Sequence, residues 1–409
     1  MKIPAYIERP LYLNRIEPYM GKGVIKVLVG QRRVGKSYML FQLMDRITTI
    51  NPDVQVLYIN KELHEFAAIR SSEDLLSYVR NHRVNDRHLV LLIDEIQDIQ
   101  DFERALRSLS AVGETEIICT GSNAALLSGE LATLLSGRYV EIKVYSLNYG
   151  EFLQFHGLQR SREAFSSYLR FGGLPYLRNL PLDEDIVFEY LRNILDAILL
   201  KDVVGRYQIR NVDFLQRLAL FLADNVGSLV SARRISAFLK SQKVKVSHNL
   251  VLDYLSHLCT AFLVFRVRRS DIVGRKIFEV GEKYYYEDLG IRNALIGYRI
   301  TDINKILENV VFMHLKMVGY DVHVGQFGSR EVDFVCERHG ERMYVQVAYM
   351  IPDDKVRDRE FGNLLAIPDN FPKFVVSMDE PMGGSYQGVR HIHAEDFLHR
   401  LSSSVSPIF

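Results

Sequence analysis

The stretch that decides the fold covers residues 24–37 and reads Val24-Ile25-Lys26-Val27-Leu28-Val29-Gly30-Gln31-Arg32-Arg33-Val34-Gly35-Lys36-Ser37. Its first six residues are mostly apolar and predict a β-strand, and the pattern of residues 38–47 predicts a helix. The loop between them has the form G-x-x-x-x-G-K-S, in which two glycines allow a tight turn whose N–H groups point at phosphate oxygens. We expect Lys36 to reach the β- and γ-phosphates of a nucleotide and Ser37 to place its hydroxyl on Mg²⁺. The predicted nucleotide-binding residues are Gly30, Gln31, Arg32, Arg33, Val34, Gly35, Lys36 and Ser37.

The composition is that of a globular protein without a dominant charge. The chain has 409 residues, enough for roughly two to four domains, and is 48% apolar and 25% charged. Its formal net charge is +1, so any surface for nucleic acid must be local. Three cysteines without CxxC spacing indicate thiols in a reducing compartment rather than a disulfide or zinc framework. Residues 1–10 do not resemble a signal peptide, and no stretch approaches the ~18 apolar residues of a membrane helix, so we expect a cytoplasmic protein without a membrane partner.

Two acids follow another buried strand. Residues 89–93 form a continuous apolar run, which is typical of a parallel strand covered on both faces. Asp94 and Glu95 come next, at the carboxyl edge where open α/β sheets bind ligands. We expect Asp94 to hold Mg²⁺ and Glu95 to act as the base that polarises the attacking water.

A further strand, residues 116–120, leads into Gly121-Ser122-Asn123. A small polar side chain at this position is suited to contact the γ-phosphate or its water, and Asn123 is the better candidate. The alternative is that Ser122 or Asn123 is the N-cap of a helix that begins at Ala124. The sequence leaves both interpretations open.

Six motifs occur in a fixed order along the chain: GQRRVGKS, LLIDEIQ, ICTGSN, LLSGRY, YSLNYGEF and YLRFGGLPYL. In this order they resemble the prokaryotic "archaeal/bacterial ATPase" family of the AAA+/STAND branch of P-loop proteins, and the resemblance spans nearly the whole chain. It implies ATP with Mg²⁺ and either a homo-oligomer or a protein partner. It also implies that Arg138 faces the γ-phosphate of a neighbouring subunit. The alternative for Arg138 is an exposed arginine near a helix C-terminus, which the helix dipole favours.

The stretch Gly172-Gly173-Leu174-Pro175 resembles the lid motif of STAND ATPases, in which the proline packs on the adenine. The resemblance therefore adds Pro175 to the nucleotide-binding residues. From the residues alone, the two glycines end a helix near Phe171 and Pro175 begins the next one. A plain corner between two helices has the same pattern.

The expected fold class is α/β with four parts. Apolar spacing after residue 211 predicts three helices, and two strands follow, an arrangement typical of a winged helix. One helix and three strands after residue 302 resemble the PD-(D/E)XK nuclease fold. The predicted division is a P-loop core over 1–150, a helical lid over 151–208, a winged helix over 209–298, a nuclease-like domain over 299–401 and a tail over 402–409.

The predicted winged helix is strongly basic. Between residues 231 and 277 there are ten basic residues and two acidic ones, Asp253 and Asp271, for a local net charge of +8. Such a segment attracts phosphate backbones with salt-sensitive affinity. His248 and Asn249 would begin the recognition helix. Two points argue against DNA binding. Winged helices of AAA+ proteins often only support the lid, and Asp253, in the middle of the presumed recognition helix, disfavours entry of that helix into the DNA groove. The basic residues are Arg233, Arg234, Lys240, Lys243, Lys245, Arg266, Arg268, Arg269, Arg275 and Lys276.

The predicted nuclease-like domain lacks two groups that its chemistry needs. Active members carry an acid on one strand and E-x-K on the next, with the acids holding Mg²⁺ and the lysine beside the attacked phosphate. Here Asp333 and Glu308 are present, but the E-x-K positions are Gln346 and Ala348. Gln346 is a weak neutral ligand and Ala348 has no charge, so we expect no nuclease activity. Lys355, in the next segment, is the candidate substitute for the missing lysine, although nothing in the sequence places it at the site.

The combined interpretation is an ATP-hydrolysing AAA+-like protein that couples nucleotide state to a DNA-associated winged helix and a degenerate nuclease-like module. Two alternatives remain. The Gly173-Leu174-Pro175 stretch favours a STAND-type signalling switch that binds a protein partner, whereas the basic segment favours DNA. An ATP-gated, Mg²⁺-dependent nuclease is disfavoured by Gln346 and Ala348.

Overall fold

The computed structural model describes residues 3–113, 115–124, 135, 137–241, 246–274, 277–381 and 385–403. The chain divides into two compact units. The first comprises Met1–Tyr145 with Thr260–Phe262, and the second comprises Ser146–Cys259 with Leu263–Phe409. Within the described residues, no helix is long and apolar enough to cross a membrane.

The first unit contains a five-stranded sheet of parallel strands in the order β2-β3-β4-β1-β5. Its strands are β1 (Ile25–Val29), β2 (Gln55–Asn60), β3 (Leu89–Asp94), β4 (Thr115–Gly121) and β5 (Tyr139–Lys143). Its α-helices are α1 (Pro10–Ile16), α2 (Lys36–Ile50), α3 (Ser72–His82) and α4 (Phe102–Val112). Short 3₁₀ helices cover Glu17–Tyr19, His64–Phe66 and Ile96–Asp98. The predicted parallel α/β core is confirmed.

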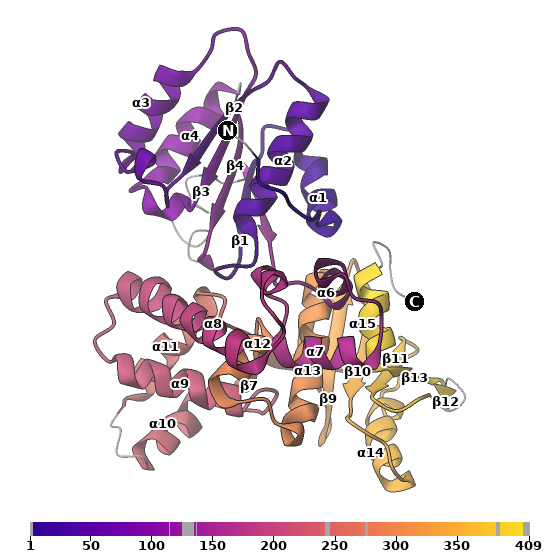
Figure 1. Ribbon diagram of the computed structural model, residues 1–409. Helices are drawn as coiled ribbons and strands as arrows, with labels where there is room; N and C mark the ends of the chain where they lie inside the picture. The colour runs from indigo at the N-terminus through magenta and orange to yellow at the C-terminus, as the bar shows by residue number, and fades with distance from the viewer. Residues whose placement is uncertain are drawn as a thin grey trace. The chain divides into compact units, whose positions relative to one another are not determined.

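Strand β1 lies between β4 and β5, and its last residue, Val29, pairs with Gly121 and Lys143. The connection after β1 leads to β2 at one edge, whereas the connection after β4 leads to β5 at the other. Right-handed crossovers therefore place α2 on one face and α3 with α4 on the opposite face (Figure 1). Such a divergence at the carboxyl ends of parallel strands is where open α/β sheets bind ligands.

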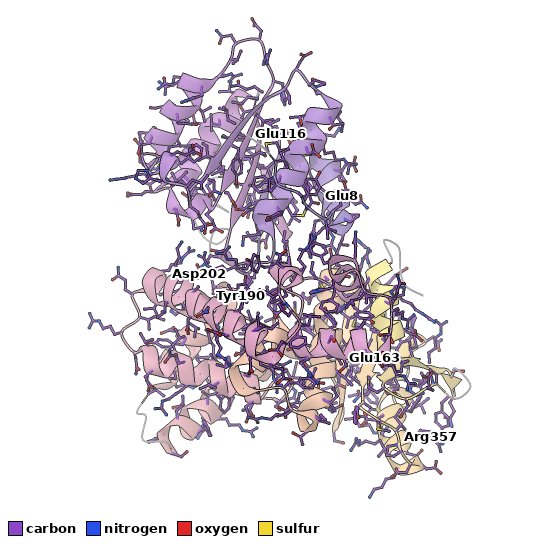
Figure 2. All side chains as sticks on the ribbon, in the orientation of Figure 1. Glu8, Glu116, Glu163, Tyr190, Asp202 and Arg357 are labelled. Carbon is purple, nitrogen blue, oxygen red and sulfur yellow. The ribbon has the colours of Figure 1, made fainter. Side chains whose placement is uncertain are left out.

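One charged pair lies inside this sheet. Lys26 of β1 and Glu116 of β4 are both buried and form an ion pair, and Glu116 is labelled in the first unit in Figure 2. Removing a single buried charge from water costs several kcal/mol, roughly, unless an opposite charge compensates it. The lysine within the apolar run of residues 24–29 is therefore tolerated because Glu116 faces it.

The second unit contains an eight-stranded mixed sheet in the order β12-β13-β11-β10-β9-β8-β6-β7. Its strands are β6 (Val264–Asp271), β7 (Ile277–Tyr286), β8 (Asp321–Phe327), β9 (Arg330–Arg338), β10 (Glu341–Val347), β11 (Lys373–Ser377), β12 (Ser385–Tyr386) and β13 (Val389–His393). Its α-helices are α6 (Tyr149–His156), α7 (Arg162–Phe171), α8 (Glu184–Ala197), α9 (Val212–Asp224), α10 (Ala232–Ser241), α11 (His248–Thr260), α12 (Leu289–Ile296), α13 (Ile303–Met317), α14 (Asp354–Leu365) and α15 (Ala394–Ser403). A π-helix covers Ile198–Gly205, and 3₁₀ helices cover Pro175–Asn179 and Ile300–Asp302.

The three helices and the hairpin expected for a winged helix occur in the predicted order, as α9, α10, α11, β6 and β7. The hairpin does not stand alone, because β6 pairs in parallel with β8 through Arg269 and Val324. It is thereby part of the same sheet as the strands that the sequence assigned to a nuclease-like domain. The winged helix, the nuclease-like fold and the boundaries at residues 208 and 298 remain predictions.

The two glycines after α7 are required by close packing. The helix ends at Phe171, and Gly172 has a φ of +76°, where a Cβ would lie 2.4 Å from Asp288 Oδ1. A Cβ on Gly173 would lie 2.4 Å from the carbonyl oxygen of Leu147. The N–H of Gly173 also donates to Asp288 Oδ2 at 2.7 Å. Packing and backbone geometry therefore explain this Gly-Gly pair without reference to a ligand.

Candidate nucleotide-binding site

The loop after β1 packs closely against the end of β5. A Cβ on Gly30 would lie 2.0 Å from the carbonyl oxygen of Val144, so only glycine fits there. Gly35, with a φ of 97°, is the N-cap of α2, and Arg33 also has a positive φ of 71°. Arg9, which is buried, donates through Nη1 to the carbonyl oxygens of Val34 and Tyr145. The loop is thus held in a fixed, left-handed turn at the start of α2.

The ammonium of Lys36 lies over this loop. Its Nζ donates to the carbonyl oxygens of Gly30 and Gln31 at 3.0 and 2.9 Å. Gln31 is only 1% exposed, and neither polar atom of its side-chain amide has a hydrogen-bond partner among the described residues. A buried polar group left unpaired costs about 1–3 kcal/mol. The Lys36 ammonium and this unsatisfied amide therefore fit a phosphate-bearing ligand.

Asp94 ends β3 and is almost fully buried. The hydroxyl groups of Thr120 of β4 and Tyr58 of β2 donate to its carboxylate, the latter at 3.4 Å. The hydroxyl of Ser37 at the start of α2 is near enough to affect the pKa of this carboxylate. Burial raises the pKa of Asp94, although the nearby hydroxyls of Ser37 and Thr120 and the charge of Lys36 oppose this. Adjacent carboxylate and hydroxyl oxygens are the donors that Mg²⁺ prefers, so Asp94 and Ser37 fit this ion.

Glu95 follows in a left-handed conformation, with a φ of 55°. Its N–H donates to Thr120 Oγ1 at 3.0 Å, and its carboxylate accepts hydrogen bonds from Gln97 and Ser122. Burial raises the pKa of Glu95, but the charge of Lys36, the Gln97 bond and the charge of Arg32 outweigh it, and the pKa is lowered. Glu95 is therefore ionised at neutral pH, as a proton acceptor must be.

The structure brings most of the predicted site residues together at the carboxyl edge of the sheet, and it describes Asn123, Arg138 and Pro175 separately from that group. Asn123 is buried near the end of β4, and the helix that the sequence predicted from Ala124 falls largely outside the described residues. Arg138 is exposed and precedes β5, where its carbonyl oxygen accepts from Ile25 at 2.8 Å. It therefore lies at the amino ends of β1 and β5, the edge opposite to the loop. Pro175 begins a 3₁₀ helix of the second unit.

Thr120 and Tyr58 were missed by sequence reasoning. Thr120 is fully buried, and its hydroxyl connects the carboxylate of Asp94 with the backbone of Glu95. The available signal was its place as a polar residue at the end of a buried strand, beside the end of β3. Tyr58 carried no such signal, because its hydroxyl reaches Asp94 from an edge strand.

The residues considered for a nuclease site also lie together in part. Asp333 is on β9, Gln346 on β10 and Glu308 on α13. The proposed substitute lysine, Lys355, is exposed on α14. A different lysine, Lys283 of β7, lies among the acids.

Comparison with known proteins places this site in a family. The family model described as "AAA domain" matches residues 22–153, which include the whole candidate site of the first unit. A protein of Haemophilus influenzae, named only as uncharacterised, is 36% identical over 400 residues, covering 96% of this chain and 99% of that protein. An uncharacterised protein of Methanocaldococcus jannaschii is 30% identical over 366 residues, covering 85% of this chain and 80% of that protein. The chain belongs to this family of AAA-domain proteins.

Two further similarities of this AAA-domain protein extend beyond residues 22–153. Residues 162–302 match a "Domain of unknown function (DUF8612)". Among solved structures, the chain is similar to the Aeropyrum pernix Orc1 protein in complex with DNA, at 15% identity and a TM-score of 0.33, over 72% of this chain and 93% of that one. That similarity is too low to bear on fold or function. The AAA domain together with the Lys36, Ser37 and Asp94 geometry supports nucleotide binding by the first unit.

Proposed function

We propose that this AAA-domain protein binds and hydrolyses ATP with Mg²⁺ and couples nucleotide state to a DNA-associated second unit. The observation that carries the proposal is the convergence of Lys36, Ser37, Asp94 and Glu95 at the carboxyl edge of the sheet. An ammonium, a hydroxyl and two buried carboxylates meet there, and the pKa of the second carboxylate, that of Glu95, is lowered. Phosphoryl transfer needs this combination.

Each group has a separate role. Lys36 would bind the β- and γ-phosphates, and Ser37 with Asp94 would hold Mg²⁺. The bound ion supplies positive charge that neutralises the phosphate oxygens. Glu95 would orient the attacking water and accept its proton.

Three further residues complete the proposed site. Asn123 would contact the γ-phosphate or its water from the end of β4. Arg138 would act on the nucleotide of a neighbouring subunit in a homo-oligomer, and its exposed position at the opposite edge of the sheet supports action in trans. Pro175 would report the bound nucleotide to the second unit.

The test of the ATPase proposal uses two single substitutions. Lys36→Ala should abolish ATP binding, because it removes the charge that faces the phosphates. Glu95→Gln should keep ATP bound with Mg²⁺ but slow hydrolysis, because Asp94 and Ser37 are untouched. Lys22→Ala and Glu65→Gln, at exposed positions of the same unit, are the matched controls. Unchanged ATP affinity and turnover in Lys36→Ala would overturn the assignment.

DNA association is supported by exposed basic side chains on two elements. Arg233, Arg234 and Lys240 are exposed on α10, and Arg266 and Arg268 are exposed on β6. Four of the remaining basic residues fall outside the residues whose side chains the structure describes: Lys243, Lys245, Arg275 and Lys276. Arg269 is partly buried. These exposed charges are suited to phosphate contacts, which give sequence-independent affinity.

The experiment measures binding of fluorescent duplex and single-stranded DNA at rising salt. Affinity should fall steeply with salt, and Arg266→Glu with Arg268→Glu should weaken binding about equally for all sequences. Arg162→Glu, an exposed arginine of α7, is the control. DNA should also change the ATPase rate. An ATPase indifferent to DNA would favour the second candidate, a signalling switch with a protein partner, which the Gly173-Leu174-Pro175 stretch favours.

A further inference from the structure

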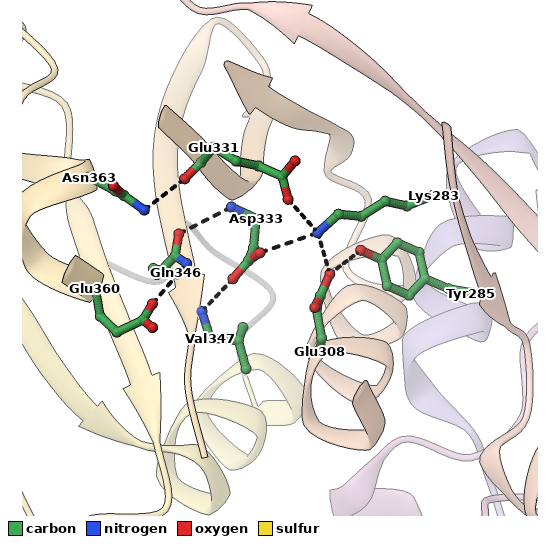
Figure 3. A network of polar contacts seen from close by, with 9 residues as sticks. All are labelled: Lys283, Tyr285, Glu308, Glu331, Asp333, Gln346, Val347, Glu360 and Asn363. Carbon is green, nitrogen blue, oxygen red and sulfur yellow. Dashed lines mark hydrogen bonds and ion pairs between the residues drawn. The ribbon is translucent and has the colours of Figure 1, made fainter. Parts of the chain in front are cut away.

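Carboxylates from two elements converge on one ammonium in the second unit (Figure 3). Lys283 Nζ of β7 lies 2.8 Å from Glu308 Oε1 of α13. It also lies 3.0 Å from Glu331 Oε1 and 3.3 Å from Asp333 Oδ1, both of β9. We call Glu308, Glu331 and Asp333 the carboxylate cage. The ammonium is at the point where all three acids meet.

The carboxylate cage is largely closed to water. The side chain of Lys283 is 3% exposed, those of Glu308 and Asp333 are 10% and 11% exposed, and that of Glu331 is 36% exposed. Three carboxylates this close, two of them buried, repel one another and lose hydration, a cost that a cation between them offsets. Without Lys283 the fold would require another cation, or protons, at the same point.

Neighbouring groups orient the carboxylates of two residues of the cage, Glu308 and Asp333. The hydroxyl of Tyr285 donates to Glu308 Oε1 at 2.5 Å. The N–H of Val347 donates to Asp333 Oδ2 at 2.9 Å, which leaves Oδ1 directed at Lys283. Gly227 packs over Glu308, where a Cβ would lie 2.9 Å from Oε2. The carboxylates of Glu308 and Asp333 are therefore held in place by their neighbours as well as by Lys283.

Gln346 belongs to this arrangement as a hydrogen-bonding group. Its Oε1 accepts from the N–H of Asp333 at 3.2 Å, and its Nε2 donates to Glu360 Oε2 at 3.0 Å. Both ends of the amide are thus used within the protein. A carboxylate at this position could not donate to Glu360, so the amide suits the network as it stands.

Lys283 stays charged in this setting. Burial lowers the pKa of Lys283, but the charge of Glu308 and the further charges of Asp333 and Glu331 outweigh it and raise the pKa well above its ordinary value. The pKa of Glu308 is raised, because it is buried with a second carboxylate nearby. The cation in the cage is therefore permanent at physiological pH.

The spacing of the cage suits an ammonium and not a metal ion. Oxygens lie 2.8–3.3 Å from the lysine nitrogen. Ca²⁺ would need them at about 2.3–2.6 Å and Mg²⁺ at about 2.0–2.1 Å, with stricter geometry. In the part of the chain that the structure describes, no group of three or more His, Cys, Asp or Glu side chains is arranged to hold a metal.

We propose that Lys283 is a built-in cation that fills the carboxylate cage in place of a divalent metal, and that removing its ammonium converts the cage into a Ca²⁺-selective site. The preference for Ca²⁺ over Mg²⁺ follows because the oxygens must move less. In the native chain the lysine ties β7 to α13 and β9, so this part of the second unit needs no metal and performs no metal-dependent hydrolysis.

The experiment is calorimetric titration of the full chain with Ca²⁺ and with Mg²⁺, without nucleotide. Lys283→Met keeps the length and apolar stem of the side chain and removes its charge. It should bind Ca²⁺ at least about tenfold more tightly than the wild type does, and more tightly than it binds Mg²⁺. Adding Asp333→Asn should abolish the gain. Lys305→Met, on α13 and 3.9 Å from Asp302, is the matched control and should behave like the wild type.

Two results would overturn the proposal. One is a folded Lys283→Met protein that gains no Ca²⁺ affinity. The other is a wild-type protein whose binding of either ion is lost in Asp333→Asn, because the cage would then take a metal beside its lysine. If Lys283→Met does not fold, Lys283→Gln, which is shorter and also uncharged, takes its place in the Ca²⁺ titration. The second comparison tests the native chain independently, since the proposal requires wild type and Asp333→Asn to bind both ions equally.

Discussion

The hydroxyl of Thr120 donates to Asp94 Oδ1 and at the same time accepts the backbone N–H of Glu95 at 3.0 Å. One side chain of β4 therefore fixes both acids at the end of β3, the adjacent strand. The proposed metal ligand and the proposed base depend on the same hydroxyl. Glu95 is also in a left-handed conformation, which a non-glycine residue rarely adopts without such support.

We predict that Thr120→Val lowers the ATPase rate by about 10- to 100-fold, as loss of an orienting group around a metal ligand typically does. Valine has nearly the same shape, so β4 should keep its packing. Thr120→Ser retains the hydroxyl and is the control. Steady-state hydrolysis and ATP affinity without Mg²⁺ are the measurements, and the affinity should change little. Hydrolysis at the wild-type rate in Thr120→Val would show that the bridge is not needed.

A second prediction concerns Gln31, whose buried amide has no partner among the described residues. Gln31→Leu should raise the free energy of unfolding of the nucleotide-free protein by about 1–3 kcal/mol, because an unsatisfied polar group is replaced by an apolar one. The same change should weaken nucleotide binding. Chemical unfolding and ATP titration measure the two effects separately.

The chain contains a matched control for this substitution. Gln42 is also buried, but it accepts the N–H of Arg9 at 3.0 Å and donates to the carbonyl of Ile7 at 3.3 Å. Gln42→Leu should therefore destabilise the protein. If both substitutions destabilise it equally, the amide of Gln31 is satisfied in solution and its assignment to the nucleotide fails.

The local parts of the nucleotide site were predictable from sequence, because their chemistry lies in consecutive residues. The loop of residues 30–37 directly follows a buried strand, Asp94 and Glu95 lie at the end of another, and the structure brings them together. Thr120 was not predictable to the same degree. Its role depends on β4 lying beside β3, and strand order is set by long-range pairing that no short motif records.

Lys283 illustrates the same difference more strongly. The sequence offers Lys355, in the segment that follows Gln346 and Ala348, as the lysine for the acids, but Lys355 is exposed. The lysine that meets Asp333 is 50 residues earlier in the chain. It belongs to β7, a strand that sequence reasoning assigned to another domain. Because β6 pairs with β8, the hairpin lies in the same sheet and its lysine reaches the acids.

A third prediction follows from the position of Arg138. Strand β1 separates it from Gly30 by five residues, roughly 16 Å of extended chain, which is longer than an arginine side chain. Any action of Arg138 on a phosphate must therefore be in trans. ATPase activity per subunit should rise with protein concentration, and mixing Arg138→Ala with Lys36→Ala subunits should restore part of the activity. A monomer with full activity at every concentration would exclude this role.

The last prediction concerns His314, a buried histidine that joins α13 to α6. Its Nε2 accepts the N–H of Tyr149 at 2.9 Å, so its proton is on Nδ1, which donates to the carbonyl of Val310 at 2.8 Å. Burial lowers the pKa of His314 to about 4 from the ordinary 6.5. A proton on Nε2 would face the N–H of Tyr149 and break this contact.

The direction of the pH effect follows from proton uptake. Between pH 6.5 and about 4 the unfolded chain protonates this histidine and the folded chain does not, so stability is complete above pH 6.5 and falls as pH drops towards 4. The full loss amounts to roughly 3 kcal/mol.

His314→Gln, whose amide can still accept and donate, should make this loss of stability with falling pH shallower, as measured by urea unfolding at a series of pH values. His156, whose pKa burial also lowers to about 4, will keep part of the slope. His248→Gln, at an exposed position, should leave the slope unchanged. Equal slopes for His314→Gln and the wild type would mean that His314 takes its proton in the folded state, and the neutral bridge between α6 and α13 would then be wrong.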